Sequence, residues 1–136
     1  MKKNMGIWID TSQAVVIKLS NNDYSVKKIE SNIETRERVP GETKKYGRFG
    51  NQYLTYEKHR ENKRNQQTGQ FLKELLKEID QCDEVVLFGP STMKYIFEKE
   101  IRNNMQMAYK LKGVETSELL TENQMVAWTK NYYKSK

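Results

Sequence analysis

The residue that most directly suggests chemistry is Asp10, which ends the first apolar run in the stretch WIDTSQAVV. An aspartate at the end of a strand can hold a divalent metal ion for nuclease chemistry if further carboxylates converge on it. A later apolar run ends in Phe88-Gly89 without an acid, and Glu57 and Glu61 lie in a basic stretch. We therefore expect the Asp10 side chain to cap a turn, with weak metal-dependent nuclease activity as the alternative.

Two other patterns could also bind or react. The stretch Gly89-Pro90-Ser91-Thr92 begins a helix directly after an apolar run, where free backbone N–H groups can bind an anion. It lacks the spacing of a P-loop, and proline in a first helical turn is also ordinary capping chemistry. Cys82 and His59 are the single cysteine and histidine, and no third group orients them as a nucleophile and base. We predict no metal site and no cofactor.

The net charge of +6 is concentrated in one part of the chain. Nine basic residues lie between Arg36 and Arg64, against four acidic residues in the same stretch. Such a concentration of positive charge favours a polyanionic partner through phosphate pairing and counterion release. The alternatives are a solvated basic surface or a contact with an acidic protein, which would make the chain a protein-interaction domain.

The composition is that of one intracellular domain. A chain of 136 residues is the size of a single domain, spanning residues 1–136. One cysteine excludes an intrachain disulfide and fits a reducing compartment. No apolar run approaches the ~20 residues that span a bilayer. We expect a cytoplasmic protein with no membrane contact.

The first half of the chain predicts three strands, a loop and a long helix. Met5–Asp10, Ala14–Leu19 and Tyr24–Glu34 form an antiparallel meander, and the last of these changes phase near Lys27-Lys28, as in a β-bulge. Residues 35–52 contain Pro40-Gly41 and carry much of the basic charge. A loop of this length is uncommon, and we predict that it is mobile. A helix over residues 53–79 follows, apolar on one side only in its second half.

The second half alternates strands and helices. Residues 84–88 form a buried central strand, residues 93–101 a helix and residues 107–115 a further strand. The last helix begins at a capping box formed by Thr121 and Gln124. The expected order, β-β-β-α-β-α-β-α, is α/β with a mixed sheet and matches the ribonuclease H-like architecture and related translation-machinery domains.

The stretch Lys44–Lys63, KKYGRFGNQYLTYEKHRENK, resembles the middle domain of eukaryotic and archaeal class I release factors and of Pelota-type rescue proteins. It is also similar to small bacterial single-domain relatives of that family. In the release factors a Gly-Arg-Gly-Gly-Gln loop precedes a long basic helix. The positions of this chain that match the loop motif are Gly47, Arg48, Gly50 and Gln52.

The resemblance implies contact with the ribosome, but Phe49 and Asn51 interrupt the loop motif. We therefore expect a non-catalytic module that binds ribosomal RNA or tRNA, with peptidyl-tRNA hydrolysis through Gln52 as the alternative. Arginine and lysine pair with phosphates, and aromatic side chains stack on unpaired bases. The RNA-binding residues are predicted to be Lys44, Lys45, Arg48, Arg60, Lys63 and Arg64 for phosphates, and Tyr46 and Phe49 for bases.

Overall fold

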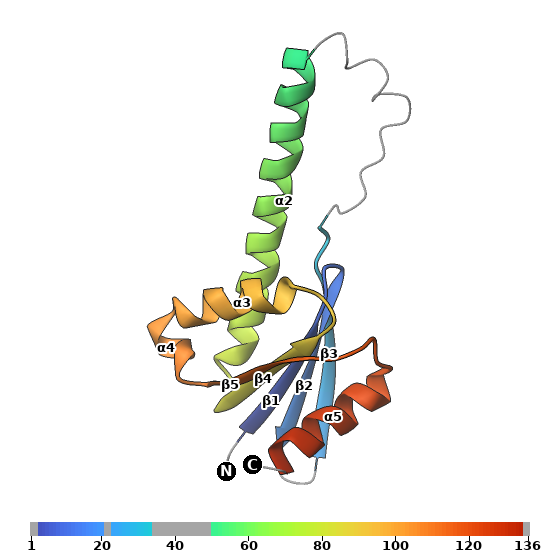
Figure 1. The fold of residues 1–136 in the computed structure, drawn as a ribbon. Helices are drawn as coiled ribbons and strands as arrows, with labels where there is room; N and C mark the ends of the chain where they lie inside the picture. Colours follow the sequence, from blue (N-terminus) through green and yellow to red (C-terminus); the bar gives the residue numbers. More distant parts are fainter. Residues whose placement is uncertain (1–2, 21–22, 34–49, 135–136) are drawn as a thin grey trace.

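A five-stranded mixed sheet forms the centre of the computed structural model, which describes residues 3–20, 23–33 and 50–134. The strand order is β3-β2-β1-β4-β5. Strands β1, β2 and β3 are antiparallel neighbours, whereas β4 runs parallel to both β1 and β5 (Figure 1). The predicted meander and central parallel strand are confirmed. The strands are β1 (Lys3–Ile9), β2 (Gln13–Ser20), β3 (Asp23–Glu30), β4 (Glu84–Gly89) and β5 (Leu111–Thr116).

Helices pack on both faces of the sheet. The helices are α2 (Gly50–Ile79), α3 (Met93–Arg102), α4 (Met105–Ala108) and α5 (Glu122–Lys134). Alternate residues of the strands point to opposite faces. Met5, Ile7 and Ile9 pack with apolar residues of α2 and α3, while Trp8 packs with Met125 and Val126 of α5. The result is a three-layer α/β domain with two separate apolar cores.

Helix α4 replaces the first part of the strand predicted over residues 107–115. Asn104 caps this short helix, because its side chain accepts a hydrogen bond from the Gln106 backbone N–H at 3.0 Å. Met107 is then buried from a helical turn rather than from a strand, and β5 begins only at Leu111. The observed order is β-β-β-α-β-α-α-β-α. The α/β mixed sheet is confirmed, while the ribonuclease H-like assignment stays a prediction.

Two further details differ from the sequence-based expectation. The register between β2 and β3 is continuous from Gln13↔Glu30 to Ser20↔Asp23, so the bulge predicted at Lys27-Lys28 is absent from these strands. Helix α2 begins at Gly50, three residues before its predicted start. Gly50 and Gln52 of the proposed loop motif therefore lie in the first turn of a helix. The helix continues without a break through Gly69.

Candidate nucleic-acid interface

Helix α2 extends well beyond the sheet (Figure 1). Its 30 residues correspond to a length of about 45 Å. Among the α2 residues whose burial is described, those buried against the rest of the molecule are all in the last third, namely Phe71, Leu72, Leu75, Glu78 and Ile79. Residues 65–70 are exposed or half-buried. In the part of α2 whose burial is described, the contacts with the rest of the molecule therefore lie near its carbonyl end.

The predicted RNA-binding residues fall largely outside the part of the chain that the structure describes. Lys44, Lys45, Tyr46, Gly47, Arg48 and Phe49 lie in residues 34–49, and the predicted mobility of the loop is likewise outside the described residues. Gln52, Arg60 and Arg64 belong to α2, but their side chains are not described. Lys63 is exposed on the same helix. The backbone of α2 therefore brings Arg60, Lys63 and Arg64 into two successive turns.

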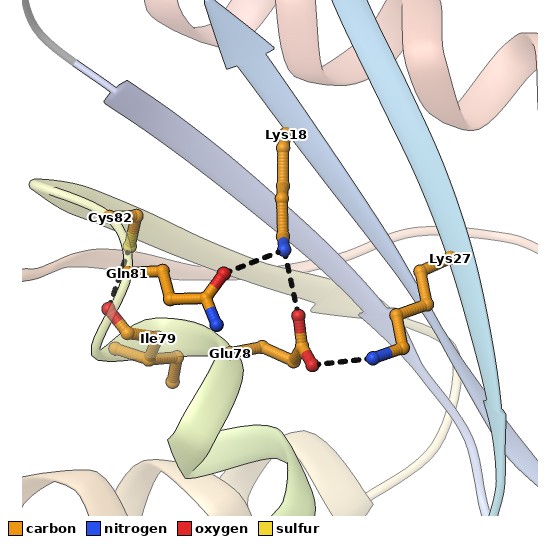
Figure 2. Close-up of polar contacts among 6 residues, drawn as sticks. All are labelled: Lys18, Lys27, Glu78, Ile79, Gln81 and Cys82. Carbon is orange, nitrogen blue, oxygen red and sulfur yellow. Dashed lines mark hydrogen bonds and ion pairs between the residues drawn. The ribbon is translucent and has the colours of Figure 1, made fainter.

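The base of α2 is fixed to the sheet by Glu78, a residue that the sequence analysis missed. Its carboxylate is 9% exposed and lies between two lysines (Figure 2). Lys27 of β3 donates a hydrogen bond to Oε2 at 2.7 Å. Lys18 of β2 lies 2.9 Å from Oε1 as an ion pair, without the alignment of a hydrogen bond. The signal in the sequence was an acid placed directly beside Leu75 and Ile79 on the buried stripe of the helix.

The charges in this cluster stabilise one another. Burial alone raises the pKa of Glu78, but the contacts with Lys27 and Lys18 outweigh it and hold the pKa below its usual range. The hydrogen bond to Glu78 in turn raises the pKa of Lys27. Lys18 also donates a hydrogen bond to Gln81 Oε1 at 3.1 Å. Both shifts favour the charged forms of Glu78 and Lys27, so the two residues form an ion pair at neutral pH.

The carbonyl groups at the C-terminal end of α2 also accept hydrogen bonds from a lysine side chain. Lys110 is 7% exposed, and its Nζ donates hydrogen bonds to Ile79 O at 3.3 Å and to Asp80 O at 3.1 Å. A cation at this end of a helix satisfies unpaired carbonyl groups and interacts favourably with the helix dipole. Two independent polar contacts therefore hold the last turn of α2.

Cys82 has the properties of a structural residue rather than a nucleophile. It is 5% exposed, and its thiol donates a hydrogen bond to Ile79 O at 3.1 Å (Figure 2). Burial raises the pKa of the thiol to about 11, so very little reactive thiolate exists at neutral pH. His59 lies on α2 with its side chain outside the described residues.

Asp10 caps the turn between β1 and β2, in agreement with the favoured interpretation. Its Oδ1 accepts hydrogen bonds from the backbone N–H groups of Ser12 and Gln13, both at 2.8 Å, and from Ser12 Oγ at 3.0 Å. Among residues 3–20, 23–33 and 50–134, no group of three or more Asp, Glu, His or Cys side chains is arranged to hold a metal ion.

The segment Gly89–Thr92 makes a tight connection between β4 and α3. Gly89 has a φ of 145°, and a Cβ there would lie 2.4 Å from Ile9 O, so the backbones meet closely. Ser91 Oγ accepts a hydrogen bond from the Met93 N–H at 3.1 Å. Lys94 is 2% exposed and donates a hydrogen bond to Ser91 O at 2.8 Å. This segment is thus occupied by internal contacts that form the turn.

Comparison with known proteins gives similarity in fold. No family model matches the sequence, and no curated protein matches it. A crystal structure of the archaeal translation termination factor aRF1 is similar, with a TM-score of 0.51 and 17% identity over 98% of this chain. Pelota from Archaeoglobus fulgidus is similar with a TM-score of 0.53 and 13% identity over 95% of this chain. The chain therefore has the fold of a release factor- and Pelota-like domain.

The likeness involves one part of those larger proteins. This chain spans 39% of the length of the aRF1 structure and 31% of the length of the Pelota structure. At these identities the resemblance predicted from the sequence is confirmed as a resemblance of fold. The part of the chain that the structure describes also contains no helix both long and apolar enough to cross a bilayer.

Proposed function

We propose that this protein is an RNA-docking module of the translation machinery, which binds ribosomal RNA or tRNA through α2 and the basic residues that precede it. The observation that carries the proposal is the long helix α2, which packs at one end and extends beyond the sheet in a domain with the fold of a termination factor. Residues 57–70 of this helix carry Arg60, Lys63 and Arg64 and contain no aliphatic residue. A helix that carries basic residues beyond its packed end is suited to contacts with phosphates.

Phosphate contacts account for affinity better than for sequence preference. Each phosphate neutralised by a lysine or arginine releases counterions, so binding weakens as salt is added. Aromatic residues interspersed with the basic ones, such as Tyr46 and Tyr53, are suited to stacking on unpaired bases. The module is therefore expected to recognise the shape and the exposed bases of a folded RNA rather than a sequence in a duplex.

The test is co-sedimentation of the purified protein with ribosomes across a salt series. We expect the variant R60A/K63A/R64A to bind more weakly and to lower the salt slope by about 2 units. The control variant K28A/K99A/K134A removes the same charge from exposed positions elsewhere. Unchanged affinity and slope in the first variant, or an equal loss in both, would contradict the proposal. Binding that survives nuclease digestion of the RNA would indicate a protein partner instead.

A second candidate is peptidyl-tRNA hydrolysis. The likeness to a termination factor favours it, and Gln52 lies in the first turn of α2. The module would then catalyse hydrolysis at the ribosome in addition to binding there. Release of peptide from ribosome-bound peptidyl-tRNA that is lost in Gln52→Ala would support this candidate, and release that persists in Gln52→Ala would exclude Gln52.

A further inference from the structure

We infer that Lys18, Glu78 and Lys27 form a clamp that sets the direction of α2 and thereby positions its RNA-binding part. The effect of the clamp on RNA binding rests on the proposed function, whereas the clamp itself does not. Glu78 is the one acidic residue that is buried among the described residues, and both of its oxygens face lysines. A carboxylate in this position is costly to bury unless ion pairs and hydrogen bonds compensate for its lost hydration.

The geometry of the clamp resists rotation of the helix. Lys18 lies on β2 opposite Ser25 of β3, and Lys27 lies on β3 opposite Val16 of β2, so the two lysines are diagonal neighbours on one face. They reach the two oxygens of one carboxylate from different strands, at 2.9 and 2.7 Å (Figure 2). Apolar contacts alone are non-directional. The two ion pairs add a fixed orientation.

The position of the clamp matters because α2 is anchored near one end, so a small change in its direction there moves the far end of the helix by a large distance. The described contacts that anchor α2 lie between Phe71 and Ile79, near its carbonyl end. Eighteen residues separate Glu78 from Arg60, which corresponds to about 27 Å along the helix. A tilt of about 15° at the base would move Arg60 by roughly 7 Å, which exceeds the length of a hydrogen bond. A small change in the orientation of α2 at Glu78 therefore produces a large displacement of Arg60.

The first measurement is the direction of α2 without RNA. Spin labels are placed on cysteines introduced at Gln66 of α2 and Asn123 of α5, both exposed, and their distance distribution is measured by pulsed EPR. Buried Cys82 remains unlabelled. We expect Glu78→Gln to broaden the distribution, and Lys27→Gln to broaden it less because Lys18 remains. The control Glu100→Gln, which removes the same charge from an exposed position on α3, should leave it unchanged.

The second measurement is ribosome binding by the same variants. Glu78→Gln should weaken binding about three- to tenfold relative to Glu100→Gln, although each substitution removes one negative charge. A distribution as narrow in Glu78→Gln as in the unmodified protein, with the fold intact by circular dichroism, would overturn the clamp. A broader distribution with unchanged ribosome affinity would overturn its role in docking. Absence of ribosome binding by the unmodified protein would instead count against the proposed function, while the EPR result still decides the clamp.

Discussion

Trp128 of α5 stacks on Phe88 of β4, with ring centroids 3.9 Å apart and an angle of 8° between the rings. Phe88 is fully buried, and Trp128 continues the stack to Tyr132, whose ring lies 5.5 Å away. The aromatic series therefore fastens the last helix to the sheet on the face opposite α2. It is a large apolar contact in a chain of low overall hydrophobicity.

Replacement of Trp128 by alanine is expected to destabilise the domain by about 2–4 kcal/mol, because it removes a large, partly buried ring that packs between α5 and the sheet and covers Phe88. Denaturant unfolding followed by circular dichroism measures the effect. Trp128→Phe retains a stacked ring and should lose clearly less stability. Equal losses for the two variants would show that stacking on Phe88 contributes little.

Gly6 and Thr129 make a second close contact between β1 and α5. A Cβ at Gly6 would lie 2.5 Å from Thr129 Oγ1, and Thr129 is fully buried. We expect Gly6→Ala to cost about 1–3 kcal/mol of stability through overpacking. The cost should be smaller in a Thr129→Ala background, where the two closest atoms are gone. A double-mutant cycle measures the coupling, and strictly additive effects would contradict the contact.

Acid should weaken the clamp at Glu78. The folded-state pKa of Glu78 is lowered from the ordinary value of 4.5, so its ionised form stabilises the fold. This contribution is fully present above pH 4.5 and is lost as the pH falls through the folded-state pKa. Glu78→Gln cannot lose a charge there, and its free energy of unfolding should therefore fall less steeply in acid. Parallel pH curves for the two proteins, from thermal unfolding, would show that Glu78 is not linked to stability.

Cys82 should resist thiol reagents in the folded protein. Its pKa of about 11 and its burial leave little accessible thiolate at neutral pH. We expect reaction with a disulfide reagent at pH 7.5 to be at least a hundredfold slower than in the denatured chain. Comparable rates in the two states would mean that the turn between α2 and β4 opens readily.

The fold was predicted well wherever the local pattern and the tertiary contacts agree. Thr121 and Gln124 form the predicted reciprocal cap, with hydrogen bonds of 2.9 and 3.2 Å. Val85, Val86, Leu87 and Phe88 of β4 are all buried, with alternate side chains in the cores on the two faces of the sheet, as a continuous apolar run indicates. The error at α4 has a different cause. The alternating apolar residues Met107 and Leu111 predict a strand. The side chain of Asn104 instead caps a helical turn, and a cap of this kind cannot be recognised from the spacing of apolar residues.

The candidate site was predicted less completely. The capping role of Asp10 followed from its position after a strand, because an aspartate two residues before a turn can reach the backbone N–H groups. The cluster at Glu78 did not follow, since Lys18, Lys27 and Glu78 are distant in sequence and ordinary in type. Only the register of β2 against β3 and the placement of α2 bring them together.

The central position of β1 has a consequence for the order in which the chain folds. β1 is paired with β2 from the same hairpin, but its other edge pairs with β4, which is made about eighty residues later. During synthesis the meander of β1, β2 and β3 is therefore expected to have an unpaired β1 edge and two uncovered apolar faces until β4 and the helices follow. The charged stretch between Arg36 and Arg64 is synthesised in that interval. Its high density of charge is expected to favour a solvated, unaggregated chain until β4 pairs with β1.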